Sequence, residues 1–597
     1  MRVAVIGGGP SGLTTLKHLV TAHYFFSGID PIEARLFEAQ SSIGGTFRYR
    51  TYEKAEMVSS KQLTTFSDYR YPIGTPDFLS TEEYCRYLEK YCKHFRLNPF
   101  IQLESRVLRV QRDDTRGPGH IVHILHAGEV SQWPCDAIAI CSGLHVIPNI
   151  PEIPGLSNIP QNFHSSEFKN SRQFGEGKNI LILGSGETGM DIAYLAIKSR
   201  TKSVTLSHRD GFFCAPKRAP ETIFFGISPC PIPRGNVPYD VGAASLFDTS
   251  YVHPILRNSF IPWEYYDLFA KFTTWLVSGT KAGLDQWIGE ISPERFHVSK
   301  IFFNKSTRAI PYISAQYRKP SVLNSLRSFI ATVPIPTSTQ GRQIDLAPWP
   351  KKIDKSGVVE FMENGRPEAK SFKNKSLKPD IVILATGYKQ CFSFLDDDYP
   401  CASDANIRNI WREGCETVSF IGFIRPSFGS IPPLAELQAQ LWITLLLNRL
   451  PNPIQSINIK HYLLQTSPKS RITYGVDHES YAYQLALDIG AAPSFTQVLL
   501  LGWKTTVSWA LSANVNPKFR LVGPWQWNGA KEIMEGEVWD TITRRRFFFG
   551  HLTLSALPIL LFGFINILLC IYSLIHKTLE IFSKKTERFI KNILVNK

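Results

Sequence analysis

Residues 1–12 read MRVAVIGGGPSG, and residues 179–191 read NILILGSGETGMD. Each stretch is an apolar run that leads into the pattern Gly-x-Gly-x-x-Gly. In this pattern the first glycine permits a tight turn after a strand, the second lets the backbone approach a pyrophosphate, and the third lets the next helix pack closely. The glycines at these positions are Gly7, Gly9, Gly12, Gly184, Gly186 and Gly189. The two loops therefore predict an α/β protein with two dinucleotide-binding, Rossmann-like units.

The first loop is followed by the other parts of a dinucleotide-binding unit. Residues 13–25 have the apolar spacing of a helix, and residues 34–38 form a second short β-rich run that ends in Glu38. A helix N-terminus offers free N–H groups and the positive end of a dipole to phosphate. A carboxylate at the end of the second strand accepts hydrogen bonds from ribose hydroxyls. The first unit therefore suits a dinucleotide with a free ribose, as in FAD or NAD.

The second unit differs at the matching place. Its second strand ends in Ser207 and Arg209, with no acid at the position that corresponds to Glu38. A hydroxyl and a guanidinium bind a 2′-phosphate, which a carboxylate would repel. The second unit therefore suits NADP. Lys217 and Arg218 are either additional positive charge for this phosphate or solvated loop charges.

Composition and charge exclude several classes of protein. The chain has 597 residues and a formal net charge of +15, but no zinc-finger or RNA-binding pattern accompanies its basic residues, so we expect no nucleic-acid partner. Ten cysteines are scattered without a CxxC pair, which predicts reduced thiols in a protein that faces the cytosol. The fifteen histidines show no metal-like spacing with cysteines, and we expect no metal site.

An apolar stretch near the C-terminus predicts a membrane anchor. No Asp, Glu, Lys or Arg occurs between Arg546 and Lys577, and about twenty apolar residues suffice to cross the hydrocarbon of a bilayer. We place the anchor at 547–576 and expect Pro558 to kink it. Both flanks are basic, so charge does not decide the orientation, and a bent hairpin with both ends in the cytosol stays open. We expect the catalytic body to face the cytosol, with the endoplasmic reticulum as the membrane.

Four further motifs point to a known family. They are SSIGGTFRY at 41–49, FHSSEF at 163–168, PDIVILATGY at 379–388 and FRLVGPWQW at 519–527. Together with the two glycine loops, they resemble the flavin-containing monooxygenases of the dimethylaniline N-oxide-forming type over most of residues 1–540. The resemblance implies an α/β fold in which an NADP-binding domain is inserted into an FAD-binding domain, followed by a C-terminal transmembrane helix.

The resemblance also implies where the domains begin and end. The FAD-binding domain would take residues 1–155 and, with a C-terminal extension, residues 336–540. The NADP-binding domain, with an aromatic-rich insertion, would take residues 156–335. The ATGY segment at 385–388 would close a strand of the FAD-binding domain, where the chain returns from the inserted domain.

The resemblance implies which residues hold each cofactor. FAD would be contacted by Gly7, Gly8, Gly9, Pro10, Ser11, Gly12, Glu38, Gly45, Thr46 and Phe47. NADP would be contacted by Gly184, Ser185, Gly186, Glu187, Thr188, Gly189, Met190, Asp191, Ser207 and Arg209. The family carries an asparagine near the reacting flavin, and this chain has Val58 at that position. The nearest polar neighbours of the flavin ring, in the catalytic position, would then be Ser59, Ser60 and Lys61.

The resemblance implies an NADPH- and O2-dependent monooxygenase. Reduced flavin would take up O2 as a C4a-hydroperoxyflavin and transfer one oxygen atom to a soft nitrogen or sulfur nucleophile of a lipophilic small molecule. The aromatic-rich residues 263–276 would either wall an apolar pocket or form a core helix or a membrane-touching face. Two alternatives stay open. One is a Baeyer–Villiger-type ketone monooxygenase, and the other is a non-oxygenating, membrane-tethered protein that binds FAD and NADP.

Overall fold

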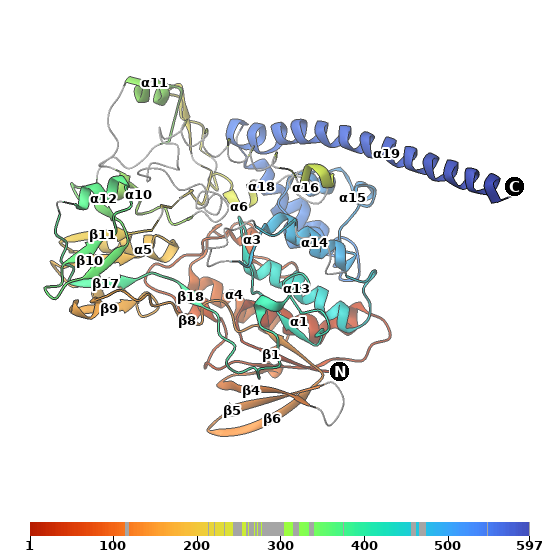
Figure 1. Cartoon of the computed structure of the whole chain (residues 1–597), viewed down its shortest axis with the longest axis horizontal. Coiled ribbons are helices and arrows are strands. Elements are labelled where there is room, and N and C mark those ends of the chain that lie inside the picture. Colours follow the sequence, from red (N-terminus) through yellow and green to blue (C-terminus); the bar gives the residue numbers. More distant parts are fainter. Residues whose placement is uncertain are drawn as a thin grey trace.

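The computed structural model describes the chain except for residues 114–118, 243–252, most of 258–303, 315–321, 334–338, 455–460, 465–472 and 596–597, and the single positions 210, 213, 220, 232, 374 and 546. Most of the aromatic-rich stretch at 263–276 therefore lies outside the described residues. The described parts include two parallel five-stranded sheets and a long C-terminal helix (Figure 1).

The first sheet contains strands from both halves of the chain. Its strands are β1 (Arg2–Ile6), β2 (Glu33–Phe37), β3 (Ile101–Gln102), β7 (Ala137–Ile140) and β19 (Val418–Phe420). They run parallel in the order β19-β7-β1-β2-β3. Residues 3–5 of β1 are fully buried, as in a central strand that is covered on both faces. The first glycine loop connects β1 to α1 (Pro10–Phe25), which packs against α13 (Ile431–Leu446).

In the sequence, all strands of the second sheet come after β7 and before β19 of the first sheet. The strands of the second sheet are β9 (Gln161–His164), β10 (Asn179–Leu183), β11 (Ser203–Ser207), β14 (Ile344–Ala347) and β17 (Ile381–Leu384). They run parallel in the order β14-β11-β10-β17-β9. The second glycine loop connects β10 to α5 (Glu187–Lys198). The predicted fold of two Rossmann-like units, one inserted into the other, is confirmed, because β19 returns to the first sheet after the second is complete.

The prediction for the ATGY segment is wrong. The strand before it, β17, pairs with β10 and β9 of the second sheet and not with the first sheet. The physical reason is the parallel pairing of β17 with β10 and β9, which brings its end so close to the second glycine loop that a Cβ on Gly184 would lie 2.4 Å from the carbonyl oxygen of Ala385. The second unit therefore extends to residue 384, and the boundary predicted at residue 335 is too early. After Gly387, β18 (Tyr388–Lys389) pairs antiparallel with β8 (Ile147–Pro148), so the outgoing and returning segments run side by side.

The remaining elements surround the two sheets. On the first unit, α2 (Thr46–Tyr49), α3 (Lys61–Thr64) and α4 (Thr81–His94) precede an antiparallel meander of β4 (Ser105–Asp113), β5 (Gly119–His126) and β6 (Glu129–Cys135). After α13 come α14 (His478–Ile489), α15 (Phe495–Leu501), α16 (Trp503–Leu511), α17 (Ala530–Ile533) and α18 (Trp539–Thr543). The helix α4 begins with a capping box between Ser80 and Glu83, which satisfies two backbone N–H groups at the helix start.

A long helix follows α18. A π-helical segment, Phe547–Ala556, leads into α19 (Leu557–Val595), which extends away from the sheets in Figure 1. The stretch Gly550–Thr586 contains an 18-residue window with a mean hydropathy of 2.5, and it is the one helix among the described residues that is long and apolar enough to cross a membrane. Many of its apolar side chains are exposed, for example Leu560, Phe564 and Leu574. Pro558 is the second residue of α19, next to the change from π-helical to α-helical structure.

Candidate functional site

The first glycine loop has the geometry that the sequence pattern predicts. Gly7 has a φ of +113°, and a Cβ there would lie 2.6 Å from the carbonyl oxygen of Cys141. A Cβ on Gly12 would lie 1.9 Å from the carbonyl oxygen of Gly7. The fold itself therefore requires glycine at both positions. Gly9 is different, because its nearest neighbour would be the Cα of Gly45, at 3.9 Å.

The second glycine loop repeats this arrangement. Gly184 has a φ of +112°, and a Cβ on Gly189 would lie 1.9 Å from the carbonyl oxygen of Gly184. Around Gly186, a Cβ would meet no described atom within 4 Å. The middle glycines, Gly9 and Gly186, thus leave open space at the N-termini of α1 and α5. This space fits a pyrophosphate that approaches the backbone N–H groups and the positive end of the helix dipole.

Glu38 lies beside the first glycine loop. It directly follows β2, and its carboxylate accepts hydrogen bonds from the backbone N–H of Gly8 at 2.6 Å and of Gln40 at 2.8 Å. Its side chain is buried. These contacts hold an acceptor at the position where a ribose would bind. The carboxylate that the sequence predicts is therefore present and oriented by the loop that it would serve.

The structure also brings the predicted Gly45 to this loop, while Thr46 and Phe47 begin the short helix that follows it. The backbone N–H of Gly44 donates to the carbonyl of Gly8 at 2.9 Å. A Cβ on Gly45, which has a φ of +55°, would lie 3.2 Å from the Cα of Gly9. Gly45 precedes α2, which begins at Thr46. A second short helix therefore starts next to the first glycine loop, and its N-terminal N–H groups add to those of α1.

At the end of β11 only one of the two predicted residues is exposed. The hydroxyl of Ser207 is buried and donates to the carbonyl of Pro348 at 2.7 Å. Arg209 is exposed, and its guanidinium carbon lies 4.7 Å from the centre of the Trp349 ring. Stacking on an indole holds the planar guanidinium while its N–H groups remain directed to solvent. Arg209 is therefore placed to bind a phosphate, whereas the Ser207 hydroxyl already has a partner.

The two acidic residues of α5 differ, since Asp191 contacts the first unit and Glu187 contacts the second. Asp191 accepts a hydrogen bond from the hydroxyl of Tyr52 at 2.7 Å and pairs with Arg308 at 3.3 Å. Glu187, at the start of the helix, accepts from the backbone N–H of Lys305 at 3.4 Å, and burial raises its pKa. Met190 is fully buried in the core of the second unit. Of the residues predicted after the glycine loop, Asp191 thus joins the two units and Met190 supports the fold.

The three predicted catalytic residues lie at the start of α3 and have different partners. The hydroxyl of Ser59 donates to the carbonyl of Gly429 at 3.0 Å. The backbone N–H of Ser60 donates to Asp240 at 2.6 Å. The ammonium of Lys61 donates to the carbonyls of Pro72 and Thr75 at 2.7 Å and of Ile73 at 3.1 Å. Burial lowers the pKa of Lys61. The Lys61 side chain therefore anchors the loop at 72–75.

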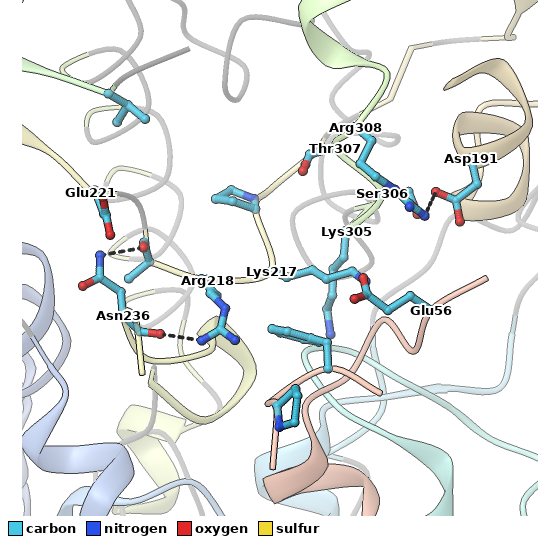
Figure 2. A pocket seen from close by; sticks show the side chains of 16 residues that line it. Glu56, Asp191, Lys217, Arg218, Glu221, Asn236, Lys305, Ser306, Thr307 and Arg308 are labelled. Atoms are coloured by element: carbon cyan, nitrogen blue, oxygen red, sulfur yellow. Dashed lines mark hydrogen bonds and ion pairs between the residues drawn. The ribbon is translucent and has the colours of Figure 1, made fainter. Parts of the chain in front are cut away.

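A cavity of about 550 Å³ lies where the two units meet (Figure 2). Charged residues of both units line it and pair across it. Lys217 pairs with Glu56 of the first unit, and Arg308 pairs with Asp191 within the second unit. Arg218 pairs with Asp77 of the first unit, which does not line the cavity. Lys217 and Arg218 are thus bound to carboxylates of the first unit and do not form an unpaired basic patch. Sequence reasoning missed the lining residues Lys305 and Arg308 because they follow an insertion without a recognisable spacing.

Comparison with known proteins agrees with this geometry. The family described as flavin-binding monooxygenase-like matches residues 1–220 and 353–552. Monooxygenase PC-14 of Penicillium crustosum is 51% identical over 92% of this chain and 94% of its own length. Monooxygenase cfoE of Aspergillus candidus is 47% identical over 97% and 99%, and human flavin-containing monooxygenase 2 is 27% identical over 89% and 91%. The S-allyl-L-cysteine S-oxygenase of Allium sativum has the same fold, with a TM-score of 0.52 and 17% identity over 91% of this chain and 98% of that one.

Proposed function

The chain belongs to the flavin-binding monooxygenase-like family, and on this premise we propose that it oxygenates a soft nitrogen or sulfur atom of a lipophilic small molecule. The protein is an FAD-containing, NADPH-dependent monooxygenase. We assign FAD to the first glycine loop and NADPH to the second on one observation. At the end of the second strand, the first unit has the carboxylate of Glu38, whereas the second unit has the guanidinium of Arg209.

The residues of the chain perform the binding steps. The open space at Gly9 and Gly186 admits the two pyrophosphates, and the N-termini of α1 and α5 stabilise their charge. Glu38 accepts hydrogen bonds from the ribose of FAD, and Arg209 pairs with the 2′-phosphate of NADPH. FAD, when bound, supplies the redox chemistry with NADPH and O2. The chain would hold the two cofactors in a fixed orientation.

The proposed substrate class is inferred from the names of similar proteins. The curated relative from Pan troglodytes is named a dimethylaniline monooxygenase of the N-oxide-forming type, and the Allium sativum protein oxygenates the sulfur of S-allyl-L-cysteine. Nitrogen and sulfur lone pairs are soft nucleophiles, so one oxygen-transfer chemistry serves both. A ketone substrate, which would give an ester, is the second candidate for the same cofactors.

The test is a substrate screen on detergent-solubilised full-length protein under labelled O2. We expect NADPH consumption to rise with an amine or thioether, and we expect mass spectrometry to find one labelled oxygen atom in the product. Esters formed from ketones would replace the proposal by the Baeyer–Villiger reaction. Peroxide formation without an oxygenated product from any amine, thioether or ketone would point to the non-oxygenating protein instead.

We further propose that α19 anchors the protein in the endoplasmic reticulum membrane with its catalytic body in the cytosol. The length and hydropathy of the stretch Gly550–Thr586 support this, as does the need of the second unit for cytosolic NADPH. The full chain should remain in the membrane pellet after alkaline carbonate extraction, and protease added to sealed microsomes should digest its body. Release by carbonate would contradict the anchor, and protection of the body would contradict the orientation.

A further inference from the structure

Two residues that follow the undescribed insertion lie directly on the second glycine loop. The side-chain amide of Asn304 donates to the carbonyl of Ser185 at 2.9 Å. The backbone N–H of Lys305 donates to Glu187, the first residue of α5, at 3.4 Å. The carbonyl of Asn304 also accepts from the backbone N–H of Ala215 at 2.9 Å. The backbone of residues 304–305 is therefore fixed to the loop that binds NADP.

The side chain of Lys305 leaves this loop and reaches a carboxylate that is bound to the first unit. Its Nζ lies 4.0 Å from Oδ2 of Asp240, and the two side chains are only 8% and 2% exposed. The same Oδ2 accepts the hydrogen bond from the backbone N–H of Ser60 at 2.6 Å. Asp240 belongs to the short helix α6 (Tyr239–Gly242), which packs against α3. Lys305 and Asp240 thus connect the NADP loop to the residues predicted beside the flavin.

The connection continues to the first glycine loop. The hydroxyl of Ser59 donates to the carbonyl of Gly429, just before α13. In the same segment, a Cβ on Gly422 would lie 2.3 Å from Oγ of Ser11, which belongs to the FAD loop. A continuous series of contacts therefore runs from Ser185, through Lys305 and Asp240, to the FAD loop. We call this series the interloop bridge.

The bridge contains polar atoms whose hydrogen-bonding capacity is not used. Within the described part of the chain, Oγ of Ser60 and Oδ1 of Asp240 are buried and have no hydrogen-bond partner. Buried polar atoms of this kind are rare in native proteins and call for a ligand or water that satisfies them. Lys305 also lines the cavity between the units, where Figure 2 shows its side chain running away from Arg308 and past Lys217. The bridge therefore borders the open space where the two units meet.

We propose that Lys305, acting through Asp240, is a positioning residue. It holds the NADP loop at a fixed position relative to Ser59, Ser60 and Lys61, the residues predicted beside the flavin, for hydride transfer. In this step a hydride with its electron pair leaves NADPH for the flavin, so that NADPH becomes NADP⁺ and the flavin is reduced by two electrons. The inference rests on the two-cofactor function of the family and is independent of which substrate is oxygenated. An ion pair in a buried site can fix a distance between two loops, and a displacement of about 1 Å at reacting atoms lowers a rate by about a hundredfold.

The test compares Lys305→Met, Lys305→Arg and a matched control, Lys351→Met. Lys351 is an exposed lysine that also pairs with a carboxylate, Glu360, at 2.7 Å. Anaerobic stopped-flow mixing with increasing NADPH separates the limiting rate of flavin reduction from the Kd of NADPH. For Lys305→Met we expect the limiting rate to fall by about thirtyfold to a hundredfold, with a Kd within about threefold of wild type. Lys305→Arg should recover most of the rate, and Lys351→Met should equal wild type.

A second readout needs no turnover. Binding of NADP⁺ to the oxidised holoenzyme should perturb the visible circular dichroism of FAD in wild type. This perturbation should shrink in Lys305→Met and in Asp240→Asn at unchanged NADP⁺ affinity. Asp240→Asn keeps an acceptor for the Ser60 N–H but removes the charge. It therefore tests the role of the Lys305–Asp240 pair even if Lys305→Met fails to retain FAD.

The outcomes are distinguishable. If NADPH does not reduce the flavin of wild-type protein, the proposed function fails. If wild type is reduced and the Lys305 and Asp240 variants match it, or if they raise only the Kd of NADPH, the interloop bridge has no role in positioning and the inference is overturned.

Discussion

Arg544 donates two hydrogen bonds to the carboxylate of Asp77, at 3.1 and 2.7 Å, although 467 positions separate the two residues in the sequence. Both side chains are almost fully buried. Burial alone would raise the pKa of Asp77, but hydrogen bonds from Arg544 and Gln62 and the nearby guanidinium charges lower it. Arg544 lies three residues before the apolar stretch at 547–576, and Asp77 follows the loop at 72–75 that Lys61 anchors. The root of the C-terminal helix is therefore tied to the segment that holds Ser59, Ser60 and Lys61.

We expect Arg544→Met to destabilise the protein by about 3 kcal/mol, because the buried carboxylate of Asp77 loses its one buried guanidinium and keeps only Gln62 and the partly exposed Arg218. The measurement is denaturant unfolding in detergent, followed by flavin fluorescence. Arg200→Met serves as the control, since Arg200 and Glu176 form an exposed pair at 3.0 Å and such pairs contribute little. Equal losses in the two variants would contradict a structural role for the buried pair.

The glycines of the second loop should separate binding from stability. Gly186 has a φ of −72° and open space around it, so Gly186→Ala should fold normally but weaken NADP⁺ binding by about tenfold or more, which corresponds to about 1.4 kcal/mol. Gly189→Ala should lower stability by about 3 kcal/mol, because its methyl group would overlap the carbonyl of Gly184. Calorimetric titration with NADP⁺ and thermal unfolding measure the two effects. Normal stability of Gly189→Ala would be inconsistent with the packing.

Coenzyme preference should depend on Arg209 and hardly on Ser207. For Arg209→Ala we expect the KM for NADPH to rise by about thirtyfold, since a charge-assisted contact contributes about 2 kcal/mol, while the KM for NADH changes little. Ser207→Ala removes a hydroxyl that is directed to Pro348, and its KM for NADPH should stay within about twofold of wild type. Initial rates of NADPH and NADH oxidation give both values. A larger effect from Ser207 than from Arg209 would reverse our assignment.

The stability of the protein should depend on pH through Lys518. Burial lowers its pKa from the ordinary lysine value of 10.5 to about 7, while its ammonium donates to Ser512 and Asn514. Between pH 7 and 10.5 the unfolded chain binds more protons at this site than the folded chain, so stability rises with pH in that window.

From pH 7 to pH 9 this contribution should amount to about 2 kcal/mol. Lys518→Met should remove it, so the difference in unfolding free energy between wild type and variant should change by that amount between the two pH values. A difference that stays constant would mean that Lys518 keeps an ordinary pKa in the folded protein.

The sequence predicted those parts of the fold that depend on local pattern. The glycine loops at 7–12 and 184–189, the strands before them and Glu38 lie as predicted, because each is specified by residues within one βα unit. The strand β17 could not be assigned, since its buried apolar run IVIL fits the centre of either sheet. Its place is set by pairing with β10 and β9, which the local sequence does not encode.

The candidate site was predicted less completely. The sequence does not show which of Ser59, Ser60 and Lys61 is free to contact a cofactor. In the structure, each of them has a different hydrogen-bond partner at the start of α3. The hydroxyl of Ser207 donates to the carbonyl of Pro348, which lies 141 positions away in the sequence. Lys305 has no signal of its own, because its contacts exist only once the loop after the insertion folds onto Ser185 and Glu187.

The insertion of one unit into the other has a consequence for biosynthesis. Until Val418–Phe420 leaves the ribosome, β7 is an unpaired edge of the first sheet, and roughly 280 residues must be translated after it before β19 can cover it. At about 5–20 residues per second, that interval lasts roughly 15 to 55 s. The nascent chain therefore carries an apolar edge strand, AIAI, through nearly half of its synthesis, and such an edge is prone to wrong pairing with other chains. A chaperone that shields exposed strands during translation would thus affect the yield of this protein more than that of one whose sheets close in sequence order.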